Sequence, residues 1–216
     1  MRNEECWYNK VCSEECSSYC IRFSEMKNLV ESSGIPKAKQ YPKPLQAGID
    51  YDAFCRLLDI KDNISKCVDN GFNLYITSAE TGNGKTSWAI KLMLKYFDEI
   101  WAGNGFRVRG MFVHVPTLLN QLKNFQKPLS EEYKQNIMNC DLVVWDDIAS
   151  TDMSGYDHSQ LLSYVDQRVF NEKANIFTGN LPSFDALTQA VGDRLASRIY
   201  RAGEVVEFRG KDRRGI

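Results

Sequence analysis

Short apolar segments alternate with amphipathic segments along most of this chain. Five apolar runs have the length of a β-strand and lie at residues 72–78, 108–115, 141–145, 174–178 and 204–208. Segments with apolar residues at helical spacing separate these runs and lie at residues 87–97, 117–125, 133–138 and 157–170. Strands that alternate with helices are typical of a mostly parallel sheet covered by helices on both faces. We therefore predict an α/β fold.

Two helical patterns precede the first apolar run. Residues 21–30 are consistent with a short helix, and residues 51–67 with one or two amphipathic helices. The stretch between them is rich in proline, which favours extended backbone before it and ends helices. We place a boundary near residue 46, which predicts an N-terminal segment with a linker at 1–45 and a larger domain at 46–216.

The sequence also indicates which side chains form the core. The helix predicted over 87–97 would bury one apolar face against the sheet, formed by Ala89, Leu92, Met93, Tyr96 and Phe97. His114 lies in an apolar strand segment and is expected to be a packed core residue. Three cysteines are expected to fill small spaces in the core, namely Cys55, Cys67 and Cys140.

The composition narrows the class of protein. With 216 residues, 43% hydrophobic and 25% charged, the chain can bury a sizeable core. A formal net charge of −1 predicts no strong long-range attraction to nucleic acid, so that DNA contact would need a local patch or an assembly. The acidic first residues predict no signal peptide, and no apolar run is long enough to span a membrane. Seven cysteines without an export signal argue against a disulfide framework, and we expect a cytoplasmic protein.

The most specific motif is a glycine-containing loop between the first strand and the next helix. It consists of Ala79, Glu80, Thr81, Gly82, Asn83, Gly84, Lys85 and Thr86. The glycines let backbone N–H groups turn towards phosphate oxygens, and the following helix adds its N-terminal N–H groups and its dipole. We predict that Lys85 reaches the β- and γ-phosphates of ATP and that the Thr86 hydroxyl holds Mg²⁺. Ala79 stands where this motif usually begins with glycine, which costs little if φ is negative.

Two carboxylates follow the strand at 141–145. A parallel sheet would bring Asp146 to the carboxyl edge of the strands, where nucleotides bind. We predict that Asp146 holds Mg²⁺ through water and that Asp147 accepts a proton from the attacking water. Asn180 follows the strand at 174–178 and could orient that water or sense the γ-phosphate, although Gly-Asn-Leu-Pro is also a turn sequence.

Basic residues near the C-terminus allow two interpretations. Arg194 and Arg198 are four residues apart, so that a helix would place them on one face. That face is either solvated or supplies an arginine that stabilises phosphoryl charge in a neighbouring subunit. The tail at 209–214 either contacts nucleotide or DNA phosphates or is a frayed terminus.

The order of four motifs resembles that of the AAA+ ATPases of the DnaC/DnaI helicase-loader family, which includes many phage proteins. The motifs are the phosphate loop, Val-Val-Trp-Asp-Asp at 143–147, Thr-Gly-Asn at 178–180 and Gly-Asp-Arg-Leu-Ala-Ser-Arg at 192–198. The resemblance covers about residues 46–216 and implies a P-loop NTPase core.

The same resemblance implies a role for each motif. It matches the Walker A pair with Lys85 and Thr86, the Walker B pair with Asp146 and Asp147, and the sensor 1 asparagine with Asn180. Arg198 matches the arginine finger, with Arg194 one turn before it. Arg214 resembles the arginine that closes the family's Gly-x-Ser-x-Arg tail, although Asp212 replaces the serine here.

The function implied is that of an ATP-dependent helicase loader. Such a protein binds Mg²⁺ and ATP, docks on a replicative DnaB-type helicase and helps to place it on single-stranded DNA. Subunits would assemble so that Arg198 of one faces the ATP of the next. The chain stops soon after its last predicted strand, which leaves no room for a C-terminal helical lid domain, so we expect modest ATP binding and slow hydrolysis by a single protomer.

Four cysteines lie in the first 20 residues, namely Cys6, Cys12, Cys16 and Cys20. Four thiolates are the number that a closed tetrahedral Zn²⁺ site needs, and two of the three gaps have a usual ligand spacing. The alternative is a set of reduced thiols, and an iron–sulfur cluster is disfavoured because there is no Cys-x2-Cys pair. By resemblance to loaders with a cysteine-bearing N-terminus, this segment would contact the helicase.

Other functions stay open on the sequence alone. A transposition-helper ATPase of the IstB type would share the same core. A nucleotide-gated adaptor that rarely hydrolyses ATP would act as an inhibitor of the helicase. A small-molecule kinase would share the phosphate loop, but it has no evident use for an aspartate pair followed by Asn180 and the arginine helix.

Overall fold

The computed structural model describes residues 6–8, 12, 17, 19–42, 48–103, 107–124, 126–150, 152–201 and 203–210. Its strands are β1 (Asn73–Thr77), β2 (Gly110–His114), β3 (Leu142–Ile148), β4 (Ala174–Gly179) and β5 (Glu204–Glu207). Its α-helices are α1 (Ile21–Ser32), α2 (Tyr51–Asp62), α3 (Ile64–Asp69), α4 (Lys85–Ile100), α5 (Val115–Leu122), α6 (Glu131–Asn139), α7 (Gly155–Phe170), α8 (Phe184–Val191) and α9 (Asp193–Ala196). A 3₁₀ turn at Lys37–Lys39 and a π-helical turn at Ser197–Arg201 complete the described elements.

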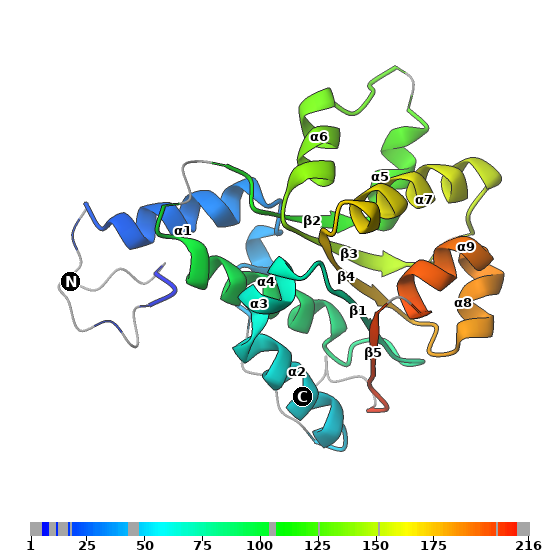
Figure 1. The fold of residues 1–216 in the computed structure, drawn as a ribbon, viewed down its shortest axis with the longest axis horizontal. Helices are drawn as coiled ribbons and strands as arrows, with labels where there is room; N and C mark the ends of the chain where they lie inside the picture. The colour runs from blue at the N-terminus through cyan, green and yellow to red at the C-terminus, as the bar shows by residue number, and fades with distance from the viewer. Residues whose placement is uncertain are drawn as a thin grey trace.

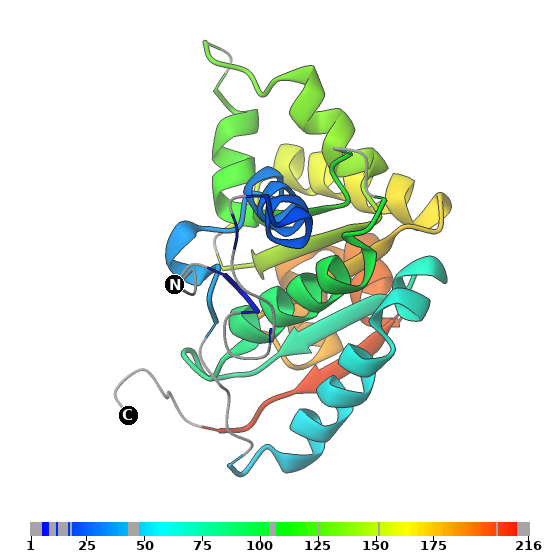
Figure 2. The same ribbon diagram turned by 90° about the vertical axis from the view of Figure 1, so that its left-hand side faces the viewer.

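The five strands form one sheet in the order β2-β3-β4-β1-β5, and every neighbouring pair is parallel. Helices cover both faces of the sheet (Figures 1 and 2). Each predicted strand is present, and the α/β class and P-loop architecture are confirmed. Because β4 lies between β1 and β3, the carboxyl ends of these three strands meet at one edge.

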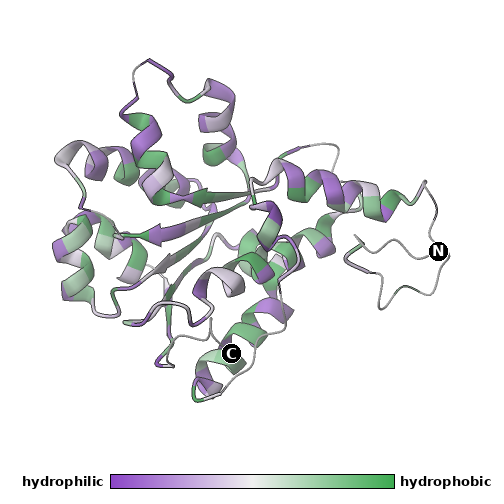
Figure 3. Ribbon diagram, turned by 180° about the vertical axis from the view of Figure 1, so that it is seen from behind, coloured by the Kyte–Doolittle hydropathy of each residue, from purple (hydrophilic) through white to green (hydrophobic). Residues whose placement is uncertain are grey.

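Alternate side chains of the strands pack into two separate hydrophobic cores, one on each face of the sheet. Leu74 and Ile76 of β1 pack with α1, α2, α3 and α4, whereas Tyr75 packs on the other face with α5, α7, α8 and α9. The helices show alternating hydrophobic and hydrophilic bands that match this one-sided burial (Figure 3). The apolar face predicted for the helix over 87–97 is confirmed, since Ala89, Leu92, Met93, Tyr96 and Phe97 are at most 1% exposed.

Two expectations about the core are wrong. His114 is exposed, because it is the last residue of β2 and its side chain lies at the carboxyl edge of the sheet. Cys55 is also exposed, on the outer side of α2, whereas Cys140 is buried and Cys67 is half-buried. Among the described helices, none is long and apolar enough to cross a lipid bilayer.

The described part of the N-terminal segment packs on the same core as the larger domain. Tyr8 is buried, and its hydroxyl donates a hydrogen bond of 2.7 Å to Asp98 on α4. Arg22 of α1 reaches the same carboxylate at 2.7 Å and lies over the Tyr8 ring. Figure 2 shows α1 beside α4 at this end of the fold. The division near residue 46 stays a prediction.

Candidate nucleotide site

The loop at 79–84 connects β1 to α4 and has the backbone that phosphate binding requires. Gly82 has a φ of 73° and Gly84 a φ of 99°, values that side chains disfavour. Gly84 stands directly before the first residue of α4, so that the free N–H groups of this helix face the loop. All eight residues of the predicted motif are described: residues 79–84 form the loop at the carboxyl end of β1, and Lys85 and Thr86 are the first two residues of α4.

Polar contacts within the loop hold its lysine in place. Lys85 is 8% exposed, and its Nζ donates to the Glu80 carbonyl at 2.8 Å and to Asn83 Oδ1 at 3.2 Å. Asn83 in turn donates to the hydroxyl of Ser78, which also accepts from the Glu80 N–H at 3.0 Å. A buried ammonium beside two neutral oxygens is suited to an anionic ligand.

Three oxygen atoms from three chain segments meet at Asp146. The Thr86 hydroxyl donates to Asp146 Oδ1 at 2.7 Å, and the Thr178 hydroxyl donates to the same oxygen at 2.8 Å. Asp146 is 3% exposed, at the point where β3 reaches the carboxyl edge. A carboxylate beside a threonine hydroxyl is the donor set that Mg²⁺ prefers, so that the residues fit the predicted metal. The structure thus brings the phosphate-loop helix and the acidic strand together.

Asp147 departs from regular strand geometry. Its φ is +64°, and the register with β4 shifts between Trp145 and Ile148. Its backbone N–H donates to the Thr178 hydroxyl at 3.0 Å, and its half-exposed carboxylate lies 3.9 Å from His114 Nε2. Asp147 therefore faces solvent at the carboxyl edge, where it could accept a proton from water.

The sequence interpretation missed Thr178 and His114. Thr178 is 1% exposed and binds both aspartates, so that it fixes the end of β3 to β4. Its signal was a hydroxyl that ends an apolar strand directly before Gly179 and Asn180. The signal for His114 was its place as the last residue of β2, in register with Asp146.

Asn180 follows β4 directly at the same edge and is partly exposed. The residue before it, Gly179, pairs with Thr77 and with Ile148. A Cβ atom at Gly179 would lie 2.7 Å from the Tyr75 hydroxyl, so that only glycine is accommodated there. Asn180 thus leaves the sheet between the end of β1 and the end of β3.

The two predicted arginines lie on one face, as expected, and both face Asp166 on α7. Arg198 Nε donates to Asp166 Oδ1 on α7 at 2.6 Å, and Arg194 lies 3.8 Å from the other oxygen of Asp166. Both arginines are exposed. Within the part of the chain that the structure describes, neither forms an ion pair or hydrogen bond with the phosphate loop, Asp146 or Asp147.

Part of the predicted site set lies outside the described residues. Cys16 and Arg214 are not described, so that the structure does not test the four-thiolate zinc site or the role of the tail. Cys6, Cys12 and Cys20 are half-buried free thiols. No cluster of three or more potential metal ligands occurs among the described residues. Zinc binding stays a prediction.

The sequence of this chain matches a known protein family. Residues 56–214 match a family described as IstB-like ATP-binding proteins. No curated protein sequence is significantly similar to the chain.

Several solved structures share the fold. The DnaC helicase loader has a TM-score of 0.66 and 17% identity, and the alignment covers 81% of this chain and 100% of that chain. DnaI has a TM-score of 0.67 and 18% identity, with coverage of 84% and 95%. A candidate primosome component from Streptococcus pyogenes serotype M3 has a TM-score of 0.64 and 19% identity, with coverage of 87% and 98%. At such identities the likeness concerns the AAA+ fold alone.

Proposed function

Since the chain belongs to the family of IstB-like ATP-binding proteins, we propose that it is an ATP-dependent loader for a replicative DnaB-type helicase. The family membership and the fold make it an AAA+ protein that binds ATP. The loader role is supported by the likeness to the DnaC helicase loader and to DnaI. The observation that carries the enzymatic part is the contact of Thr86 and Thr178 with one oxygen of Asp146.

The predicted site residues at the carboxyl edge of the sheet each have a role in ATP hydrolysis. The loop N–H groups and Lys85 bind the phosphates, while Thr86 and Asp146 would hold the Mg²⁺ ion, which neutralises phosphate charge when bound. Asp147 accepts a proton from water, and Asn180 orients that water. Arg198 is exposed and is held by Asp166, so that it is available to act on the ATP of a second subunit.

Calorimetry with Mg²⁺ and ATP tests the binding step. We expect Lys85→Ala to abolish ATP binding, because the only cation of the loop is lost, while Lys95→Ala on the same helix leaves the affinity unchanged. Detection of no ATP or ADP uptake by the well-folded, unaltered protein would refute the ATPase and the loader together.

Replacement of Asp147 separates an enzyme from an adaptor. Asp147→Asn keeps a polar group of the same size but removes the base, so that ATP binding is retained and turnover falls by about 10²-fold or more. Helicase loading should fall with turnover. An adaptor or inhibitor that does not need hydrolysis would act equally well with the variant, and that result would favour the alternative.

The partner distinguishes a loader from a transposition helper, an alternative that the IstB-like family match keeps open. Affinity capture from the native cell, with the unaltered protein and Lys85→Ala as parallel baits in the presence of ATP, should recover a DnaB-type helicase. Recovery of a transposase instead would replace the loader by a transposition helper.

The remaining parts of the loader hypothesis concern DNA and the N-terminal segment. The exposed arginines at 194, 198 and 201 offer positive charge that suits single-stranded DNA. The N-terminal segment, with its four cysteines, is the part that we expect to contact the helicase. A cytoplasmic location follows from this role in DNA replication.

A further inference from the structure

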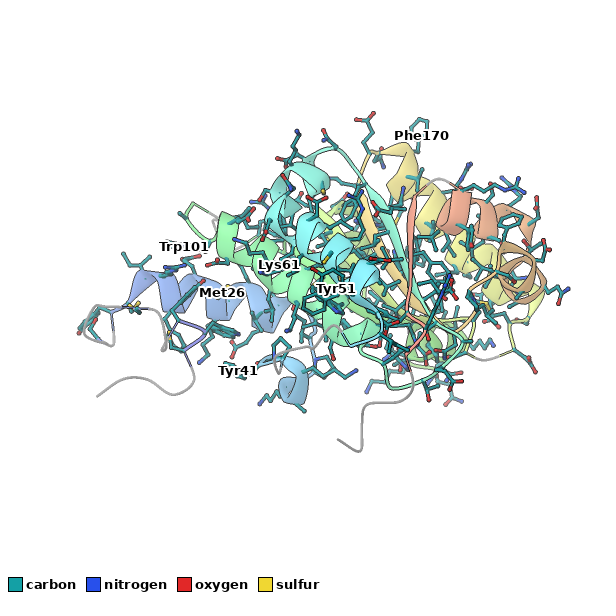
Figure 4. The ribbon with its side chains drawn as sticks, turned by 90° about the horizontal axis from the view of Figure 1, so that it is seen from below. Met26, Tyr41, Tyr51, Lys61, Trp101 and Phe170 are labelled. Atoms are coloured by element: carbon teal, nitrogen blue, oxygen red, sulfur yellow. The ribbon has the colours of Figure 1, made fainter. Side chains whose placement is uncertain are left out.

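The outer surface of α7 carries an aromatic side chain without cover. Phe170, the last residue of α7, is 87% exposed. Among the large hydrophobic side chains of the described residues, only Tyr19 has a higher exposed fraction. Figure 4 shows Phe170 at the outer end of its helix, projecting away from the rest of the fold. A phenyl ring in this position is suited to an interface.

A hollow of about 620 Å³ joins this ring to Arg198, the predicted arginine finger. Its lining comes from α7 and from the π-helical turn, and consists of Ser163, Asp166, Gln167, Val169, Phe170 and Arg198. One surface therefore combines an apolar anchor with Arg198.

Asp166 holds Arg198 by one edge only. The carboxylate accepts from Arg198 Nε at 2.6 Å, while an arginine has four more N–H groups on its two terminal nitrogens. These terminal groups are the fork that binds a phosphate. Because α7 is firmly packed, Asp166 fixes the direction in which the fork points without occupying it.

Charge indicates what covers this surface. Arg194 and Arg198 share the single carboxylate Asp166, which leaves the three side chains with a net charge of +1. The opposite sign is found at the nucleotide edge of the same molecule, where Asp146, Asp147 and a bound triphosphate would lie. A second copy of the chain can therefore cover the surface head to tail, with its nucleotide edge facing Arg198.

We propose that Phe170 and Asp166 belong to the docking surface for the nucleotide edge of a second copy of this chain. Phe170 is the apolar anchor, and Asp166 is a positioning residue that aligns Arg198 with the neighbour's phosphates. This inference rests on the proposed function, because it requires Arg198 to act between subunits.

A mixing experiment with full-length chains tests first whether Arg198 acts between subunits and then whether Phe170 and Asp166 belong to the docking surface. Lys85→Ala cannot bind ATP but keeps its arginine, and Arg198→Ala keeps its ATP site but lacks the arginine. Each should be inactive alone, and their mixture should regain ATP turnover, because the site of one is completed by the other. No recovery in the mixture would refute the action of Arg198 between subunits and with it this inference, whereas ATP binding and helicase capture test the loader role on their own.

Placement of a second substitution then tests the surface. We expect Phe170→Ser on the Lys85→Ala chain, which donates the arginine, to weaken the productive pair by about 30-fold, the effect of losing an aromatic anchor. Asp166→Asn on that chain should lower the maximal turnover of the mixture at least about 10-fold, with an unchanged KM for ATP. The same substitutions on the Arg198→Ala chain should leave the turnover of the mixture unchanged, because that chain contributes its other face.

Control and refuting outcomes follow from this design. Ile21→Ser removes another exposed apolar side chain, 70% exposed on α1, and should have no effect on either chain. Equal losses from both placements would show that Phe170 and Asp166 only stabilise the fold. Full recovery with the substitutions on the arginine donor would overturn the inference while leaving the proposed function intact.

Discussion

Thr178 is the residue by which β4 holds Asp146 and Asp147, the two aspartates proposed to act in catalysis, and its replacement by valine tests the site most directly. Valine has nearly the same shape but lacks the hydroxyl. Asp146 would lose one of two threonine donors, at 2.8 Å, and the Asp147 N–H would lose its acceptor at 3.0 Å. The change thus removes two contacts without creating a large cavity.

The magnitude follows from the charge and burial of these groups. A hydrogen bond to a carboxylate contributes about 1.5–3 kcal/mol, and an N–H left without an acceptor costs about 1–3 kcal/mol when buried. Since Asp147 is half-exposed and its hydrogen bond is only partly buried, we take the lower part of the second range. Thr178→Val should then lower the free energy of unfolding by about 2.5–4 kcal/mol. It should also weaken the binding of Mg²⁺ and ATP.

Thr178→Ser is the matched control. Serine keeps the hydroxyl and loses one buried methyl group, which costs about 1 kcal/mol. Urea unfolding with a common slope gives both values, and calorimetry gives the affinities. The reasoning is refuted if the valine variant is no less stable than the serine variant and binds Mg²⁺ and ATP like the unaltered protein.

Three further predictions concern stability, pH and metal. Arg168 is fully buried and donates to four oxygens at 2.6–2.9 Å. Arg168→Met should therefore lower the free energy of unfolding, measured in urea, by about 3 kcal/mol, and an unchanged stability would contradict this. Burial raises the pKa of Asp141, but hydrogen bonds led by that of Arg109 lower it below its ordinary value of 3.8. This carboxylate therefore stabilises the fold above that pH. The difference in the free energy of unfolding between the unaltered protein and Asp141→Asn should disappear as the pH falls below 3.8. A difference that does not change with pH would exclude the ionised carboxylate as its cause. Untagged protein should contain one equivalent of zinc that Cys16→Ser removes and Cys140→Ser does not, and less than half an equivalent of any metal would end the zinc hypothesis.

The sequence predicted what depends on local patterns. Continuous apolar runs located all five strands, because helices cover both faces of a parallel sheet. Helical spacing of apolar residues located the long helices, because burial of one face imposes a period of 3.6. The phosphate loop was predictable because its glycines, Lys85 and Thr86 act within one short segment. Asp146 could be placed because a strand that ends in carboxylates points them to the carboxyl edge of a parallel sheet.

Contacts between distant segments were not predictable in this way. Arg198 and Asp166 are 32 residues apart, and their pairing depends on how α9 and the π-helical turn pack on α7. The error at His114 has a similar cause, since a strand pattern does not show where the covering helices end. Hydropathy favours burial for a residue inside an apolar run, but the last position of β2 lies beyond that cover.

The backbone at the end of β3 gives an argument for function that does not depend on the phosphate loop. In a regular strand, successive side chains point to opposite faces, so that the carboxylates of Asp146 and Asp147 would lie on different faces of the sheet. A positive φ at Asp147 and another at Ala149 end this alternation and turn the second carboxylate towards solvent. Each such conformation costs a non-glycine residue on the order of 1–3 kcal/mol and concentrates at ligand sites. Two residues with positive φ within three positions therefore mark the end of β3 as a ligand site. The phosphate loop marks the same place independently, because Thr86, 60 residues before Asp146 in the chain, contacts Asp146.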